Sequence, residues 1–213
     1  MVCVTNSHVV SQMKKPANND FPILDQLRDR WSPRAFSDRL VDDTVLGALF
    51  EAARWAPSCF NVQPWRFIIA TSSHQPTYKQ ALSCLTEWNR NWACNAPLLL
   101  FVIAKTTYED GSHNRHAYYD CGQAMTSLVT QATTLGLFVH QIGGILIEQV
   151  RETYNIPSEY DPICGAALGY IGPSSSLSEK LRKKESEPRA RLDLSDLAYV
   201  GTWGNSALQV RKK

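Results

Sequence analysis

The apolar stretch "APLLLFVIA", residues 96–104, constrains the fold of this chain more than any other feature. It is far shorter than the roughly 20 residues that a membrane-spanning helix needs, so it is interpreted as a buried strand. Successive residues of a strand face opposite sides of a sheet, and this run is apolar on both sides. The stretch therefore predicts the central strand of a sheet.

The sequence around this strand predicts several helices and further strands. Asp20 can cap a first helix, with Pro22 in its opening turn. Pro57 would stop a helix over 42–56, and Gly136 suits a left-handed position after a long helix. The other expected elements are helices over 76–85, 115–135 and 148–156, and strands over 66–70, 98–104, 137–142 and 163–171. Their order predicts long helices around a small sheet.

Length and composition bound the class of protein. The 213 residues suit a flexible leader over 1–19, without a signal peptide, and a single domain over 20–213. The net charge of +2, and the lack of aromatic residues in the charged segment 174–191, give no reason to expect nucleic acid or a membrane as a partner. The six cysteines form no C-x-x-C pair and predict free thiols in a reducing, cytoplasmic setting. His113 and His116 have no further ligand at zinc spacing, so no metal is expected.

The stretch "RWSPRAF", residues 30–36, places Arg30, Ser32 and Arg34 close together. Pro33 and the density of charge disfavour a helix here, so the segment is expected to be a loop. An anion-binding site explains the two arginines, and so does a solvated turn.

Three other stretches are candidates for a binding site. "APSCFNVQPWRF", residues 56–67, crowds Ser58 and Asn61 between a helix end and a strand, where polar residues tend to face a ligand, although turn chemistry also explains them. "VHQIGGI", residues 139–145, has two glycines that let backbone approach a flat ligand. "EPRARL", residues 187–192, supplies Arg189 and Arg191, which, like Arg30 and Arg34, are spaced to point the same way along extended backbone.

Together these stretches resemble the nitroreductase family of FMN-dependent oxidoreductases, over most of the chain. "RWSPRAF" is similar to the family's R-x-S-x-R/K-x-F, and "APSCFNVQPWRF" to its A-P-S-x-x-N-x-Q-P-W-x-F. "NRNWACNAPLLLFV" and "ALGYIG" also fall where the family places similar strings. The resemblance implies an α+β fold, with a small mixed, mainly antiparallel sheet flanked by helices and with long helices at a homodimer interface.

The resemblance also implies FMN as the cofactor. Arginine forks suit its phosphate dianion. The phosphate and ribityl end would be held by Arg30, Ser32, Arg189 and Arg191. Trp31 is bulky where the family usually has a smaller or polar residue, so a contact with the cofactor and packing on the surface both remain open.

The ring of FMN would meet a second group of residues, by the same resemblance. Arg34 would lie by the N1 and C2 carbonyl edge, where reduction places negative charge. Asn89 would hydrogen-bond the pyrimidine side. Gly144, with Gly143 beside it, would offer its backbone N–H to N5, where hydride arrives and leaves. No further catalytic side chain is assigned.

The family builds its site at a homodimer interface. The residues expected to reach the FMN of the other subunit are Pro57, Ser58, Cys59 and Asn61. Cys59 stands where the family often has Ser. The long helix to Leu135 would be a main dimer contact, although packing within one subunit also explains its apolar residues.

The implied activity is a ping-pong reaction. NAD(P)H delivers hydride to FMN and leaves, and an acceptor such as a nitroaromatic or a quinone then uses the same cavity. No G-x-G-x-x-G loop is present, so NAD(P)H would bind transiently over the flavin. One alternative is a flavoenzyme of the same fold that acts as a reductive dehalogenase, an azoline dehydrogenase or a flavin-cleaving enzyme. The lid segment would decide between these reactions, and residues 105–115 are the candidate lid. The other alternative is a flavin-binding protein without turnover.

Overall fold

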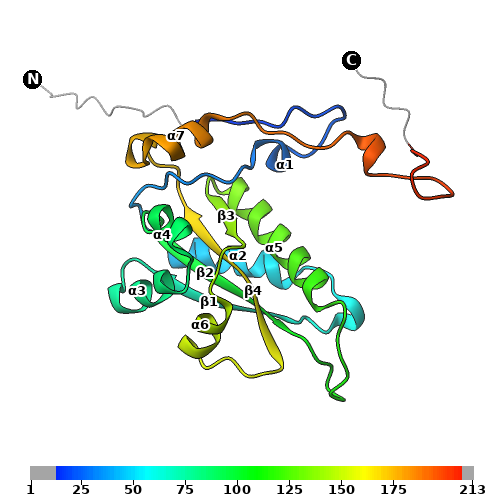
Figure 1. Cartoon of the computed structure of the whole chain (residues 1–213), viewed down its shortest axis with the longest axis horizontal. Helices are drawn as coiled ribbons and strands as arrows, with labels where there is room; N and C mark the ends of the chain where they lie inside the picture. Colours follow the sequence, from blue (N-terminus) through cyan, green and yellow to red (C-terminus); the bar gives the residue numbers. More distant parts are fainter. Residues whose placement is uncertain (1–12, 208–213) are drawn as a thin grey trace, which may run out of the picture.

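A four-stranded sheet in the order β1-β2-β4-β3 lies at the centre of the computed structural model, which describes residues 13–207 (Figure 1). Each neighbouring pair of strands is antiparallel. The strands are β1 (Trp65–Thr71), β2 (Leu98–Lys105), β3 (Phe138–Ile142) and β4 (Tyr160–Gly169). All four strands expected from the sequence are present, and the α+β class is confirmed.

The strand β2 is buried along almost its whole length, as its apolar sequence predicts. Alternate residues enter two different cores. Leu99 and Phe101 pack in one core, whereas Leu98 and Leu100 pack in the other. The sheet therefore separates two apolar layers, each of which is closed by helices.

Helices cover both faces of the sheet (Figure 1). One core is closed by α2 (Asp43–Arg54) and α5 (Ala117–Thr134). The other core receives side chains from α3 (Gln75–Ser83), α4 (Glu87–Ala93), α6 (Ile147–Thr153) and α7 (Glu179–Ser186). Gly136 follows α5 with φ of 75°, which confirms its expected left-handed conformation.

Two of these helices have no apolar stripe in the sequence. α4 has seven residues, of which Trp92 and Ala93 are buried, so no apolar periodicity marks it. α7 lies in the charged segment 174–191 and buries only Leu181 and Glu185. Both helices are stabilised by a few tertiary contacts rather than by an apolar stripe.

The first expected helix is wrong in its extent. Instead of starting at Asp20 and Pro22, α1 covers only Asp25–Asp29, and Leu24 is its N-cap residue. The apolar side chains of Ile23, Leu24 and Leu27 are exposed. A helix of about one turn gains too little from packing an exposed face to extend toward the N-terminus.

The N-terminal segment is joined to the body where the structure describes it. Lys15 Nζ donates to the Glu185 carbonyl at 2.7 Å, and the Ala17 N–H donates to Arg28 O at 2.7 Å. Residues 1–12 of the expected leader lie outside the described residues. Within residues 13–207, no helix combines the length and apolar character needed to cross a membrane. The same part of the chain holds no group of three or more His, Cys, Asp or Glu that could bind a metal ion.

Candidate functional site

The segment 30–36 is a loop with a bend at Arg34, and over residues 30–35 its residues alternate between buried and partly exposed. The buried residues of the segment are Trp31, Pro33, Ala35 and Phe36, and the partly exposed ones are Arg30, Ser32 and Arg34. On the buried side, the Trp31 ring meets Phe138 of β3 edge-on, with 6.2 Å between centroids. This anchoring leaves the two arginines and the serine free to face a ligand.

Three arginines gather at one end of this segment. Burial lowers the pKa of the Arg30 guanidinium, and the charges of Arg189 and Arg191 lower it further. Arg30 Nη2 also donates to Ser32 Oγ at 3.1 Å. No carboxylate within residues 13–207 forms an ion pair with Arg30. This arginine cluster, consisting of Arg30, Arg189 and Arg191, therefore concentrates positive charge that favours a bound anion, although the charge of Asp29 acts on Arg189.

The two C-terminal arginines of the cluster differ in their contacts. Arg189 Nη1 donates to the carbonyls of Lys15 and Arg28, at 2.9 and 2.6 Å, so it ties the N-terminal segment to the end of α1. Arg191 is exposed, and its Nη1 contacts only the neighbouring Ala190 carbonyl, at 2.7 Å, within the described chain. Arg191 is thus free to turn toward an anion, whereas Arg189 has a structural task as well.

Asn89 and Gly144 come together at another place on the site. Asn89 Nδ2 donates to the Gly144 carbonyl at 3.2 Å and to Thr86 Oγ1 at 3.1 Å. A Cβ on Gly144 would lie 2.3 Å from Asn89 Nδ2, so a larger residue at this position would displace the Asn89 side chain. A Cβ on Gly143 would meet nothing within 4 Å, so the neighbouring backbone borders open space. The loop after β3 is therefore held against α4 with one side uncovered.

Arg34 lies between α4, β3 and α7. Its guanidinium carbon is 5.9 Å from the ring centroid of Trp92, and Trp92 in turn contacts His140 of β3 at 4.4 Å between centroids. Arg34 Nε is buried and has no hydrogen-bond partner among residues 13–207. A buried guanidinium nitrogen without an acceptor is costly, and a ligand carbonyl would satisfy it.

His140 holds the buried side of the segment in place. Its Nδ1 donates to the Pro33 carbonyl, with 2.8 Å between the atoms. Burial, and to a smaller extent the charges of Arg34 and Arg30, lowers the pKa of His140 to about 4. The neutral ring is therefore the form present near pH 7, and it acts as a fixed donor rather than as a proton carrier.

One loop of the expected site lies far from the segment 30–36 within a single subunit. This loop contains Pro57, Ser58, Cys59 and Asn61. Its Cys59 N–H donates to Asp120, near the start of α5, whereas Trp31 lies near Thr133 at the helix end. The two places are separated by roughly 20 Å of helix. Figure 1 shows the loop, in cyan, beyond the end of α2. Within one subunit, the loop therefore lies away from the segment 30–36.

The candidate lid lies beside this loop. In segment 105–115, the Tyr108 N–H donates to Ser112 O at 2.8 Å, and an isolated bridge pairs Thr107 with His113. Burial raises the pKa of Tyr108, and the neighbouring Cys59 adds to this rise. The lid and the loop therefore form one surface.

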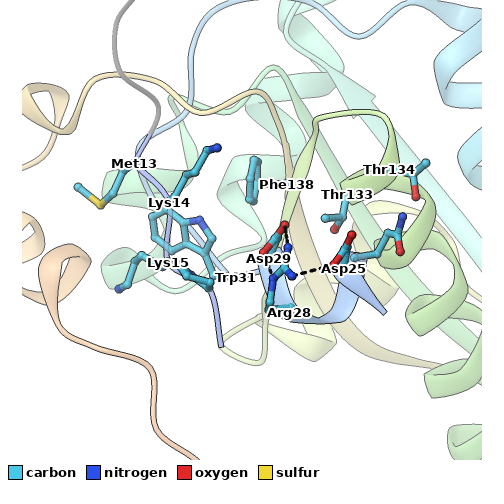
Figure 2. Close-up of a pocket in the computed structure, with 12 residues that line it drawn as sticks. Met13, Lys14, Lys15, Asp25, Arg28, Asp29, Trp31, Thr133, Thr134 and Phe138 are labelled. Carbon is cyan, nitrogen blue, oxygen red and sulfur yellow. Dashed lines mark hydrogen bonds and ion pairs between the residues drawn. The ribbon is translucent and has the colours of Figure 1, made fainter. Parts of the chain in front are cut away.

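A cavity of about 530 Å³ lies on the buried side of the segment 30–36 (Figure 2). Trp31 and Phe138 form part of its wall, together with residues of the N-terminal segment, α1 and α5. Lys15 Nζ lies 4.9 Å from the centroid of the Trp31 ring. None of Arg30, Ser32 or Arg34 lines this cavity. The side chain of Trp31 thus packs away from the open side, and only its backbone remains available to a ligand there.

Four supporting residues were not found from the sequence. They are Trp92, Asp120, His140 and Glu185, and each is a polar or aromatic side chain in a buried position. Glu185 stands in a charged run typical of a solvated helix. Its spacing of four residues from Leu181, on the same helical face, is the one signal that could have indicated burial.

Fold and site together define a class of α+β protein with an antiparallel sheet and a basic segment at its edge. The model of the "Nitroreductase family" matches residues 27–170, more than half of the chain. The chain therefore belongs to the nitroreductase family.

Curated relatives and solved structures agree with this assignment. An "Uncharacterized 15.4 kDa protein in ask 5'region" of Mycolicibacterium smegmatis is 32% identical, over 58% of this chain and 83% of its own length. A "Putative NADH dehydrogenase/NAD(P)H nitroreductase" of Methanothermobacter thermautotrophicus is 25% identical, over 70% of this chain and 76% of its own. The structure described as "the oxidoreductase containing FMN" superimposes with a TM-score of 0.83 at 34% identity, covering 88% of this chain and 96% of that one. A nitroreductase family protein of Clostridium difficile 630 has a TM-score of 0.62 at 25% identity, covering 81% and 94%.

Proposed function

We propose that this FMN-dependent oxidoreductase takes hydride from NAD(P)H and passes it to a small acceptor such as a nitroaromatic or a quinone, in a ping-pong reaction. The observation that carries the proposal is the arrangement around the segment 30–36. The arginine cluster lies at one end of that segment, and Arg34 with its unpartnered Nε lies at the other. A long ligand with an anionic tail and a polar ring suits such a site.

The residues present fit FMN. The arginine cluster would hold the phosphate, because its three guanidinium groups gather without a paired carboxylate on Arg30. Ser32 would contact the ribityl chain from beside Arg30. Arg34 Nε and the open backbone at Gly143 would meet the ring, with Asn89 holding the Gly144 loop in place. When bound, FMN supplies the hydride transfer between two substrates that use the same cavity in turn.

The chain's own groups support this chemistry by position and charge. Arg34 places a fixed cation where negative charge develops on reduction, and such preorganised charge stabilises the charged state. His140 fixes the Pro33 carbonyl and thus the turn that carries Arg34. Because His140 is neutral near pH 7, it adds no second positive charge to this corner.

We further propose a homodimer in which the loop 57–61 completes the partner's FMN site. Apolar side chains that face solvent in one subunit support a second copy as the occupant of this face. Tyr119 of α5 is 70% exposed and Trp203 of the C-terminal segment is 91% exposed. A hollow of about 570 Å³ runs along α5 beside Pro57. Figure 1 shows the segment after α7 reaching beyond the body of the subunit, as an arm for a partner would.

We assign the protein to the cytoplasm as part of the same proposal. All five cysteines of the described residues are free thiols, which suits a reducing compartment.

Absorbance spectroscopy of the purified protein tests the proposed activity. The account predicts a yellow protein that bleaches under anaerobic NADH or NADPH and regains its colour when a nitroaromatic or a quinone is added. Free FMN with the same reagents and no protein is the control. A protein that stays yellow with both nucleotides is a flavin-binding protein without this turnover, and a colourless protein that takes up no FMN contradicts the cofactor assignment itself.

A further inference from the structure

Glu185 of α7 is a nearly completely buried carboxylate beside the segment 30–36. It is 1% exposed. Its Oε1 accepts the backbone N–H of Arg34 at 2.7 Å and that of Ala35 at 3.1 Å. The carboxylate thus fixes the backbone of the very residue whose guanidinium faces the proposed ring site.

The second oxygen of Glu185 has a different relationship to Arg34. Oε2 lies 3.7 Å from Arg34 Nη1, close enough for charge attraction but too far for a hydrogen bond. Oε2 and Arg34 Nε are both shielded from solvent and have no hydrogen-bond partner within residues 13–207. The two groups therefore attract each other without being locked together, and the guanidinium keeps donors free for a ligand.

Positively charged side chains lie close to Glu185. Lys15 donates from Nζ to the backbone carbonyl of Glu185, and the Glu185 charge acts to raise the Lys15 pKa, although burial lowers it overall. The Glu185 carboxylate therefore has two N–H donors on one oxygen and two cationic side chains nearby.

We infer that Glu185 is a positioning residue for Arg34 that also sets how strongly Arg34 favours the reduced cofactor. The inference rests on the proposed function, in which Arg34 lies against the flavin ring. Arg34 stabilises negative charge on the ring, and the buried negative charge of Glu185 offsets part of that effect. Glu185 therefore holds the cofactor potential below the value that Arg34 alone would give.

The two roles of Glu185 separate chemically. Holding the backbone requires only an acceptor oxygen, which the amide of glutamine retains. Offsetting the charge of Arg34 requires a carboxylate, which glutamine lacks. Glu185→Gln therefore removes the electrostatic role and leaves the two backbone hydrogen bonds in place.

The test is a spectroelectrochemical titration of FMN-saturated Glu185→Gln and wild-type protein. We expect the variant to bind oxidised FMN within about threefold of the wild type, and its preference for reduced over oxidised FMN to rise roughly three- to tenfold. That change converts to a midpoint potential about 15–30 mV higher, since tenfold corresponds to about 30 mV for a two-electron couple. Glu179→Gln, an exposed carboxylate on the same helix, is the matched control and should leave the potential unchanged.

A purely structural role predicts another pattern. Glu185→Gln would then lower the melting temperature or the FMN affinity without moving the potential, and that result overturns the inference. In the Arg34→Gln background, adding Glu185→Gln should produce a much smaller rise, because the cation that Glu185 offsets is gone. An equal rise in both backgrounds also overturns the inference.

Two further results keep the test decisive. If Glu185→Gln does not fold, Glu185→Asp is the second variant. Its shorter side chain keeps the negative charge but moves it away from Arg34, so we expect a smaller rise in the midpoint potential. An unchanged midpoint potential counts against the inference. If wild-type protein itself binds no FMN, the proposed function fails and the inference fails with it, which differs from normal FMN binding with an unmoved potential.

Discussion

The buried carboxylate of Asp120 accepts a hydrogen bond from the backbone N–H of Cys59, with 3.1 Å between Oδ2 and the nitrogen. Asp120 is 1% exposed and lies near the start of α5. The loop that it holds contains three non-glycine residues with positive φ, namely Phe60, Asn61 and Gln63. Such conformations persist only when the surroundings enforce them. α5 therefore fixes the shape of the loop that we expect to meet the partner's cofactor.

Asp120→Ala should loosen this loop and destabilise the protein. The partly buried Cys59 N–H would lose its acceptor, which costs about 1–3 kcal/mol in the free energy of unfolding. Asp120→Asn keeps an acceptor oxygen, so its free energy of unfolding should fall distinctly less than that of Asp120→Ala. Urea denaturation measures both variants, and equal stability of Asp120→Ala and wild type would show that the hydrogen bond does not hold the loop.

The homodimer prediction centres on Tyr119. We expect the wild type to be a dimer by light scattering, and Tyr119→Glu to become monomeric, because the substitution replaces an exposed aromatic ring on the solvent-facing side of α5 with a charge. Monomerisation should release FMN, since the loop 57–61 of the partner is then missing. Lys79→Glu, on the exposed side of α3, should remain a dimer. A wild-type monomer that keeps tightly bound FMN would refute the shared site.

Arg34→Gln should lower the FMN midpoint potential by roughly 20–60 mV. Two charges about 4 Å apart interact by about 4 kcal/mol at an effective dielectric near 20, and partial exposure with delocalised ring charge reduces this to about 1–3 kcal/mol. Reduction by NAD(P)H should slow, while FMN still binds through the arginine cluster. Potentiometry of FMN-saturated wild type and Arg34→Gln measures this shift in midpoint potential. An unshifted potential with weakened binding would place Arg34 at the phosphate instead.

His140 should make stability depend on pH. Burial lowers its pKa from 6.5 to about 4, so the unfolded chain takes up the proton first as the pH falls. The free energy of unfolding therefore has its full value above about pH 6.5. It falls by about 2–3 kcal/mol as the pH drops toward 4, after allowance for the partial exposure of His140. His140→Phe should flatten this part of the profile in urea denaturation, whereas exposed His74→Gln should not. A wild-type slope in His140→Phe would mean that other groups cause the acid sensitivity.

The fold followed from the sequence wherever apolar periodicity was strong. The run 98–104 predicted a strand buried on both faces, and Gly136 marked the end of α5. Prediction failed for α1 and α4, because short helices depend on a few tertiary contacts that no local pattern reports.

The candidate site was predictable only in part. Arg30, Ser32 and Arg34 alternate with buried residues, and the sequence displays that spacing directly. Glu185 and Asp120 could not be identified, since a buried carboxylate and a solvated one look alike in a sequence. Their burial comes from packing between segments far apart in the chain.

The most direct test of the central claim compares the binding of FMN and riboflavin, which lacks the phosphate, by calorimetric titration of the apoprotein. The account predicts that wild type binds FMN far more tightly than riboflavin. Arg191→Ala should weaken FMN binding about ten- to a hundred-fold, or about 1.5–3 kcal/mol, leave riboflavin binding nearly unchanged and leave the melting temperature intact. Arg189→Ala should weaken FMN binding and also lower the melting temperature, because it releases the carbonyls of Lys15 and Arg28. Equal affinity for FMN and riboflavin in the wild type would contradict the assignment of the arginine cluster to the phosphate.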